Sequence, residues 1–266
     1  MDSRAIGVYD SGVGGICVLK ELQRLLPNEN FIYFADTANL PYGNKSTEQI
    51  INYSHRIISW LQNEMDVKMI VAACNTSSAI AIDQSLAKFS IPIIGTIQPI
   101  ISHIMQNNSY KKIGVIATPA ACKSKAHENA LLSRGFEGRV LSISCPDFVP
   151  LIESNQVNSL LMKQRVKEYL ASFEQSKLDT LVYGCTHYPL IKNLIENELS
   201  DAVQYIDPAE YMALEAKKFI MEDKLQNEAK FPNVDYYCSE APKVFTQKIF
   251  DLWGVRVETN LPTGAY

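Results

Sequence analysis

Two cysteines in this sequence have matching surroundings that suit proton transfer. Cys74 opens a CNT motif and Cys185 opens CTHYP, and each follows a short apolar segment typical of a buried strand. A helix is expected to begin just after each cysteine, and a helix N-terminus lowers the pKa of a thiol. His187 is placed to hold or transfer a proton for Cys185, and Asp10 is expected to do the same for Cys74. As a matched pair, the two thiols are predicted to be functional.

The other explanation is that both cysteines are ordinary core residues. The chain has 6 cysteines and no CxxC pair, so nothing in it favours a zinc ribbon or a thioredoxin-like motif, and no metal site is expected. Scattered cysteines in a cytosolic chain are normally reduced and most often serve as small buried hydrophobes. What sets Cys74 and Cys185 apart from the other cysteines is the match between their polar neighbours.

Short apolar segments alternate with segments of helical periodicity along the whole chain. Ser46 and Gln49 form a capping-box pattern at the start of one helix. Strands are expected at 6–9, 31–36, 69–74, 92–95, 111–118, 140–144, 180–185, 203–207, 234–238 and 255–259. The helices between them are expected at 14–26, from 46, from 75 to about 89, at 121–134, at 157–173, from about 190 and from 208. This alternation is typical of parallel sheets covered by helices on both faces.

The chain contains two similar halves. The segment IGVYDS, from Ile6, resembles IGVIAT, which begins 107 residues later at Ile113. VAACNT, from Val71, resembles VYGCTH, from Val182, at an offset of 111 residues. Two matches at nearly one offset indicate two α/β domains related by duplication. Because ligands bind beyond the carboxyl ends of the strands in open α/β sheets, two facing domains would enclose one site, with the cysteines on opposite sides of it.

Two glycine-containing loops are candidate ligand-binding segments. In DSGVGG at 10–15, a polar pair ends a strand and glycines open a helix, so backbone N–H groups suit an anion such as a carboxylate. The loop lacks the GK[ST] of a Walker A motif, and a tight turn is the other explanation. In PYG at 41–43, Gly43 could supply a backbone N–H to a ligand or simply form a turn.

The remaining titratable residues are less informative. His55, His103 and His127 lie in helical segments and are expected to be structural. Glu153 directly follows CPDFVPLI, near the end of a short helical segment. Its carboxylate can be a surface group or a functional group, and the sequence leaves both interpretations open.

Composition restricts the function classes. The 266 residues carry a net charge of −4 without a dense Lys/Arg block, which disfavours nucleic acid or an anionic membrane as a partner. The N-terminus lacks the apolar region of a signal peptide, and the most apolar long stretch, 91–105, is too short and too polar to span a bilayer. A soluble, cytoplasmic protein is expected.

Taken together, the motifs resemble bacterial glutamate racemase. Those that carry the resemblance, in order, are DSGVGG at 10–15, PYG at 41–43, CNT at 74–76, CPDFVPLIE at 145–153, GCTHYPL at 184–190 and YYCSEAPKVF at 236–245. The resemblance covers nearly the whole chain, and GCTHYP beside DSGVGG is its most specific part. It implies two pseudo-symmetric α/β domains, one of residues 1–96 completed by 207–266 and one of 97–206, with the active site in the cleft between them.

The resemblance also implies an activity and a set of site residues. The family interconverts L- and D-glutamate without a cofactor and supplies D-glutamate for peptidoglycan. Cys74 and Cys185 match its catalytic cysteines, and Asp10, Glu153 and His187 match its auxiliary acid/base positions. The substrate contacts it implies are Asp10, Ser11, Tyr42, Gly43, Asn75, Thr76, Thr186 and His187. The family often dimerises, so a homodimer is possible.

The chemistry fits these residues. Racemisation removes a proton from one face of Cα and returns one to the other, so one cysteine must be a thiolate and the other a thiol. A free thiol has a pKa of about 8.5, which must fall toward neutral for one cysteine to act as a base. The carbanion needs preorganised donors, which Ser11, Asn75, Thr76, Thr118, Thr186 and backbone amides could supply. By resemblance, Cys74 would deprotonate D-glutamate and Cys185 L-glutamate.

Two departures and three alternatives stay open. Ala121 stands where the family often has threonine, and His127 where it often has tyrosine, which affects how the side-chain carboxylate is recognised. The alternatives are an aspartate racemase, a thiol redox protein that pairs Cys74 with Cys185, and a glutamate-binding module without catalysis.

Overall fold

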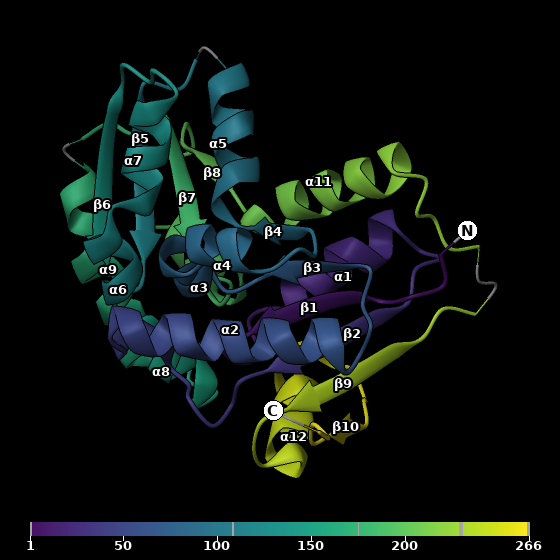
Figure 1. Cartoon of the computed structure of the whole chain (residues 1–266). Coiled ribbons are helices and arrows are strands. Elements are labelled where there is room, and N and C mark those ends of the chain that lie inside the picture. Colours follow the sequence, from purple (N-terminus) through teal and green to yellow (C-terminus); the bar gives the residue numbers. More distant parts are fainter. Residues whose placement is uncertain (1, 108, 175, 229–230, 265–266) are drawn as a thin grey trace.

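Parallel strand pairing organises the fold into two sheets. The structure, a computed structural model, describes residues 2–107, 109–174, 176–228 and 231–264. Its strands form one sheet of order β10-β9-β2-β1-β3-β4 and a second of order β6-β5-β7-β8, and every strand pair in both is parallel (Figure 1). All carboxyl ends within a sheet therefore meet at one edge.

The first sheet is built from both ends of the chain. Its strands are β1 (Ile6–Asp10), β2 (Phe31–Ala35), β3 (Met69–Ala72), β4 (Ile93–Gly95), β9 (Val234–Cys238) and β10 (Thr259–Asn260). Strands β1, β2 and β3 are completely buried, because helices cover both faces. The second sheet lies within the middle of the chain and contains β5 (Lys112–Ala117), β6 (Arg139–Ser144), β7 (Thr180–Gly184) and β8 (Gln204–Ile206).

The two sheets repeat one topology, as the matched motifs predict. The order β2-β1-β3-β4 in the first sheet corresponds to β6-β5-β7-β8 in the second. Ile6 of β1 lies beside Met69 of β3, and Ile113 of β5 lies beside Thr180 of β7. The two cysteine motifs thus follow equivalent strands. This confirms the α/β fold with two helix-flanked parallel sheets, whereas the exact domain bounds stay a prediction.

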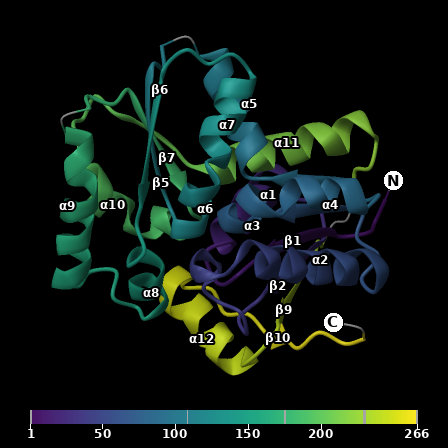
Figure 2. The same ribbon diagram turned by 60° about the vertical axis from the view of Figure 1, so that its left-hand side comes forward.

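Helices cover both faces of each sheet (Figures 1 and 2). The helices are α1 (Ile16–Leu25), η1 (Tyr42–Asn44), α2 (Thr47–Asn63), α3 (Asn75–Ile80), α4 (Ile82–Lys88), α5 (Ile97–Gln106), α6 (Pro119–Ser124), α7 (Ala126–Ser133), α8 (Phe148–Glu153), α9 (Leu160–Glu174), η2 (Tyr188–Ile191), α10 (Lys192–Glu196), α11 (Pro208–Glu222) and α12 (Pro242–Trp253). In the first sheet, α1, α11 and α12 pack on one face and α2 on the other. In the second, α8 and α9 lie opposite α5 and α7.

Several elements differ from the sequence expectation. The helix expected at 121–134 is two helices that meet at Lys125, which has a left-handed φ of 54°. Ser124 explains the break, because its hydroxyl donates to the Ala121 carbonyl and accepts from the Ala126 N–H. The helix expected from 75 to about 89 is likewise divided at Ala81.

The strand expected at 255–259 is almost absent. Only Thr259 and Asn260 pair with β9. Val255 and Val257 do pack against the core of the first sheet. The alternation of apolar and polar residues at 255–259 therefore indicates which side chains are covered, and it does not indicate strand pairing of the backbone. The capping box at Ser46 and Gln49 is confirmed by hydrogen bonds in both directions.

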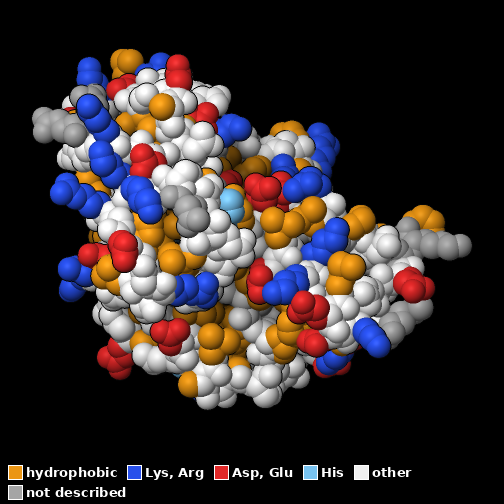
Figure 3. Space-filling view, turned by 90° about the horizontal axis from the view of Figure 1, so that it is seen from above, with side chains coloured by type: hydrophobic (Ala, Val, Ile, Leu, Met, Phe, Trp, Pro, Cys, Tyr) orange, Lys and Arg blue, Asp and Glu red, His pale blue; other side chains and the backbone are white. Residues whose placement is uncertain are grey.

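The surface carries no dominant charge on the face that Figure 3 shows, where basic and acidic side chains are interspersed. Among the described helices, none is long and apolar enough to cross a lipid bilayer.

A buried ion pair ties distant segments to the first sheet. Lys68, just before β3, is paired with Glu29, and the side chains are 0% and 3% exposed. Lys68 also donates to the carbonyls of Asp2 and Leu225, and Glu29 accepts the Asn227 N–H. The pair thus holds the N-terminal segment and the segment after α11 against the sheet.

We expect Lys68→Met to lower the free energy of unfolding by about 3–5 kcal/mol, because Glu29 would stay buried without its cation. Urea denaturation measures this change. Arg24→Met is the matched control: it breaks the exposed pair with Glu21 and is expected to cost less than about 1 kcal/mol. Equal costs for the two variants would contradict the assigned role of Lys68.

Candidate active site

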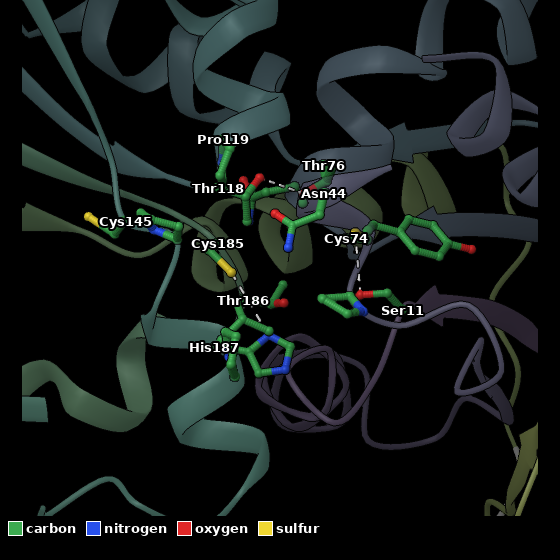
Figure 4. Close-up of a pocket in the computed structure, with 17 residues that line it drawn as sticks. Ser11, Asn44, Cys74, Thr76, Thr118, Pro119, Cys145, Cys185, Thr186 and His187 are labelled. Carbon is green, nitrogen blue, oxygen red and sulfur yellow. Dashed lines mark hydrogen bonds between the residues drawn. The ribbon is translucent and has the colours of Figure 1, made fainter. Parts of the chain in front are cut away.

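The carboxyl ends of the strands in the two sheets line a common cavity. Its walls are formed by Ser11, Pro41, Tyr42, Gly43, Asn44, Cys74, Asn75, Thr76, Thr118, Pro119, Cys145, Pro146, Val149, Pro150, Cys185, Thr186 and His187. Figure 4 shows Cys74 and Cys185 on opposite sides of this space. Ten of the residues predicted from the sequence therefore meet here, whereas Asp10 and Glu153 lie behind the wall.

Cys74 is positioned by strand β3 and helix α3. It is the residue before α3, it is 4% exposed, and its Sγ lies 3.9 Å from the Ser11 hydroxyl oxygen. Burial, and next the charge of Asp10, raise the pKa of Cys74 to about 12, although the Ser77 backbone N–H opposes them. The helix lowers the pKa of Cys74 through this N–H, but the net decrease expected from the sequence is wrong, because a helix of 6 residues does not offset the loss of water.

Cys185 follows strand β7 and forms a contact pair with His187. The Sγ atom lies 3.8 Å from Nδ1 of His187, and Nε2 of the same ring lies 2.8 Å from Oε1 of Glu153. Burial lowers the pKa of His187, but the hydrogen bonds with Cys185 and Glu153 outweigh it, so the pKa is raised well above the ordinary value. An imidazolium in this position can give a proton to Cys185, and the neutral imidazole that remains can take it back. The expected helix start at Cys185 is instead a short 3₁₀ turn, η2.

Asp10 connects the two halves of the site. One carboxylate oxygen accepts the Gly12 N–H at 2.8 Å, and the other accepts the Thr186 hydroxyl at 3.1 Å. Burial raises the pKa of Asp10, and the charge of His187 opposes this increase. The hydrogen bonds of Asp10 therefore go to Gly12 and Thr186. Its service as the proton partner of Cys74 stays a prediction.

Glu153 is largely buried, so the alternative of a surface carboxylate is wrong. Its side chain is 10% exposed, with Oε1 toward His187 and Oε2 2.8 Å from the ammonium of Lys248 in α12. Burial raises the pKa of Glu153, but His187 and Lys248 together lower it to about 2. The sequence does not mark Lys248 as functional, because one lysine on an amphipathic helix is usually a surface residue and the motif that carries the family resemblance ends at 245.

Polar side chains at the cavity wall leave hydrogen-bonding capacity for a ligand. Asn75 is 2% exposed, and neither atom of its side-chain amide has a partner within the described residues. The hydroxyls of Thr76 and Thr118 bond each other at 2.9 Å across the two halves. Tyr42 also lines the cavity, and its hydroxyl donates to Asp36. A buried unpaired amide costs free energy unless a ligand satisfies it.

The two departures from the family pattern lie outside the cavity wall. Ala121 is buried at the first turn of α6, and His127 is 4% exposed on α7 with Nε2 unpaired among the described residues. Burial lowers the pKa of His127 to about 4, so its ring is neutral at physiological pH. His55 and His103 contact aromatic rings, as expected for structural residues.

The residues described in the structure contain no cluster of three or more His, Cys, Asp or Glu side chains arranged for a metal. All six cysteines are free thiols. The cavity places the thiols of Cys74 and Cys185 on opposite walls, hydroxyl and amide donors between them, and an imidazole–carboxylate pair beside Cys185. This arrangement can exchange protons with a small polar ligand from two sides.

The ion pair of Glu153 predicts a pH-dependent stability. Because the folded pKa of Glu153 is about 2 and the ordinary value is 4.5, its contribution is present above about pH 4.5 and is lost as the pH falls toward 2. The raised pKa of His187 contributes stability below about pH 6.5, which is lost as the pH rises through the folded pKa. The free energies of unfolding of wild type and Glu153→Gln should therefore differ most between about pH 4.5 and 6.5.

Urea denaturation at acidic, intermediate and alkaline pH measures this difference. Glu168→Gln is the control, because Glu168 forms its ion pair with Arg165 at the surface and should give a small difference at every pH. A difference for Glu153→Gln that is constant with pH would contradict the charged assignment.

Comparisons with known proteins identify the family of the chain. Residues 17–216 match the model of the Asp/Glu/Hydantoin racemase family. A glutamate racemase from Trichodesmium erythraeum is 40% identical over 258 residues, which cover 97% of this chain and 94% of that protein. One from Lactococcus lactis subsp. cremoris is 44% identical over 78% of this chain and 76% of its own length.

Solved structures give the same result. A Bacillus anthracis glutamate racemase, isoform RacE1, superposes with a TM-score of 0.93 at 30% identity, covering 98% of both chains. A Francisella tularensis glutamate racemase in complex with D-glutamate has a TM-score of 0.90 and 36% identity, covering 100% of this chain and 99% of that one. With its paired cysteine motifs and two matching sheets, the chain belongs to the Asp/Glu/Hydantoin racemase family, among the glutamate racemases.

Proposed function

We propose that this protein interconverts L- and D-glutamate without a cofactor, with Cys74 and Cys185 as opposed acid and base. The observation that carries the proposal is the pair of buried thiols, which follow equivalent strands of two sheets and line one cavity from opposite sides. The Francisella tularensis relative, which binds D-glutamate in its structure, supports the choice of ligand.

The proposed reaction needs one thiolate and one thiol. One thiolate takes the Cα proton and becomes a thiol, and the pair of electrons left on Cα forms a carbanion. The opposite thiol then gives its proton to the other face of Cα and becomes a thiolate. Protonation states are therefore exchanged between Cys74 and Cys185 in each turnover, and the reverse reaction uses the same steps in the opposite order.

The raised pKa of Cys74 requires a positive charge near the thiol during the reaction. A zwitterionic amino acid brings its α-ammonium group into the cavity, and an opposite charge within a few ångströms favours the thiolate. The Cys74 thiol donates to the Ser11 hydroxyl, and once the thiolate has formed, the same hydroxyl can donate a hydrogen bond to the sulfur. On the other wall, His187 supplies the positive charge for Cys185.

The substrate carboxylates need donors that are already oriented. The proposed contacts are Asp10, Ser11, Tyr42, Gly43, Asn75, Thr76, Thr118, Thr186 and His187, of which all except Asp10 line the cavity. The unpaired amide of Asn75 and the linked hydroxyls of Thr76 and Thr118 are the donors best placed to receive an oxyanion. Asp10 acts from behind through Thr186, and Glu153 acts through His187.

The wider role follows from the product. D-glutamate would serve peptidoglycan biosynthesis and so cell-wall biogenesis and cell shape, in the cytoplasm. The proposed domains are residues 1–96 with 207–266, and residues 97–206, with the substrate in the cleft between them. A homodimer stays a prediction.

We expect Cys74→Ala and Cys185→Ala each to lower racemisation by about 10²- to 10⁴-fold, because each removes one proton-transfer group. In deuterated water, the wild-type product should gain deuterium at Cα while recovered substrate does not, since the two protons come from different thiols. NMR of each enantiomer measures this. Cys122→Ala, a half-buried cysteine outside the cavity wall, should keep full activity. Full activity of either cavity variant would refute the two-base mechanism.

Glutamate should be preferred over aspartate by about 10- to 200-fold in kcat/KM, because the cavity would lose the packing of one methylene with the shorter acid. Loss of the circular dichroism signal of D-glutamate and of D-aspartate measures the two rates, with Cys185→Ala as the blank. Turnover of aspartate alone would instead assign an aspartate racemase.

A further inference from the structure

A chain of polar contacts leads from Cys185 out to a lysine on the C-terminal helix. Cys185 contacts His187 at 3.8 Å, His187 contacts Glu153 at 2.8 Å, and Glu153 contacts Lys248 at 2.8 Å. The first two residues follow β7, the third ends α8, and Lys248 lies in α12, which Figure 2 shows beside α8. Cys74 has the Ser11 hydroxyl beside it in place of such a chain.

We infer that Lys248 is a positioning residue of the site: it holds Glu153 in one orientation and offsets its charge, and so sets how firmly His187 and Cys185 hold their protons. The inference rests on the proposed function only in taking Cys185 as a proton-transfer group.

The orientation of Glu153 follows from how its two oxygens are divided. Oε1 receives His187 and, at 3.4 Å, the Val13 N–H, while Oε2 receives only Lys248 among the described residues. A Cβ on Gly12 would lie 2.5 Å from Oε1, so the carboxylate packs directly against the glycine loop. Without Lys248, one oxygen of a largely buried carboxylate would lose its partner, and the carboxylate would be free to turn away from His187.

The charges around His187 show why a cation is needed. The ring faces Cys185 on its own loop, Glu153 from α8 and Asp10 from the end of β1. Two carboxylates near one imidazole would bind its proton so tightly that the ring could not release it. Lys248 compensates one of these charges from behind. Removing it makes the surroundings more negative, which raises the proton affinity of both His187 and Cys185.

Helix α12 holds Lys248 firmly in place. Phe245 and Ile249 are buried in the core of the first sheet, and Leu252 packs against the cores of both sheets. The Lys248 side chain between them is 33% exposed, so its replacement leaves no large cavity. The C-terminal segment adds two strands to the first sheet, and through Lys248 it also contacts Glu153, which belongs to the second half of the site.

The test compares Lys248→Gln and Lys248→Met with Lys248→Arg, and uses Lys243→Met, an exposed lysine of the same helix, as the matched control. The readout is the pH dependence of iodoacetamide alkylation, followed at Cys185 and Cys74 separately by mass spectrometry. Loss of the cation should move the Cys185 profile to higher pH by roughly half to one unit, and the Cys74 profile by less. Lys248→Arg and Lys243→Met should leave both profiles in place.

Kinetics adds a second readout. We expect Lys248→Gln to lower kcat by about 10-fold with KM changed less than about 2-fold, and Lys248→Arg to restore most of kcat. Because the two enantiomers have equal free energy in water, kcat/KM must fall equally in both directions, which checks the data. An unshifted Cys185 profile in both neutral variants, with urea curves like wild type, would overturn the inference. Alkylation of the cysteines does not require turnover, so it tests the role of Lys248 even if the protein is not a racemase. The racemase reaction itself is tested by the Cys74→Ala and Cys185→Ala variants.

Discussion

Parallel strand pairing is the constraint on which the site depends. In a parallel sheet every strand ends at the same edge, and the connections return by helices over the faces. A thiol placed one or two residues after a central strand must therefore lie at that edge. Because the chain builds this sheet twice, with β1-β3 equivalent to β5-β7, two edges supply two thiols to one cavity. No loop has to carry either cysteine into position.

Where the edges of the two sheets meet, water is excluded from the polar groups between them. These groups must then satisfy one another's hydrogen bonds and charges. Asp10 of the first half accepts the Thr186 hydroxyl of the second, and Cys17 in α1 contacts the Thr186 carbonyl at 3.5 Å. These contacts join the halves, but the same burial raises the pKa of Cys74. Burial of this kind favours the neutral form of the Cys74 thiol until a charged ligand enters. Binding and activation of the thiol are then one event.

The sequence predicts what depends on pattern and misses what depends on contacts between distant segments. Cys74 and Cys185 were found because strand periodicity and polar neighbours are local properties. Local reasoning predicts the wrong direction for the pKa shift at Cys74, because it counts the helix after the cysteine and not the water that burial removes. Lys248 was missed for the same reason: it contacts Glu153 across 95 residues of sequence, and nothing in its own helix marks it. The break at Lys125 depends on one serine hydroxyl, which a periodicity count ignores.

Duplication of the backbone has not produced duplication of the acid–base groups. The equivalent strands place Cys74 beside a hydroxyl, and Cys185 beside an imidazole backed by a carboxylate and a lysine. Yet the reaction proposed for them runs between mirror-image molecules of equal free energy, so the overall barrier is the same in either direction. Two unlike surroundings can satisfy that condition, because the substrate itself is unsymmetrical: its ammonium, carboxylate and side chain are different groups. The chirality of the ligand makes the two thiols inequivalent, so each half of the protein needs its own means of controlling its proton.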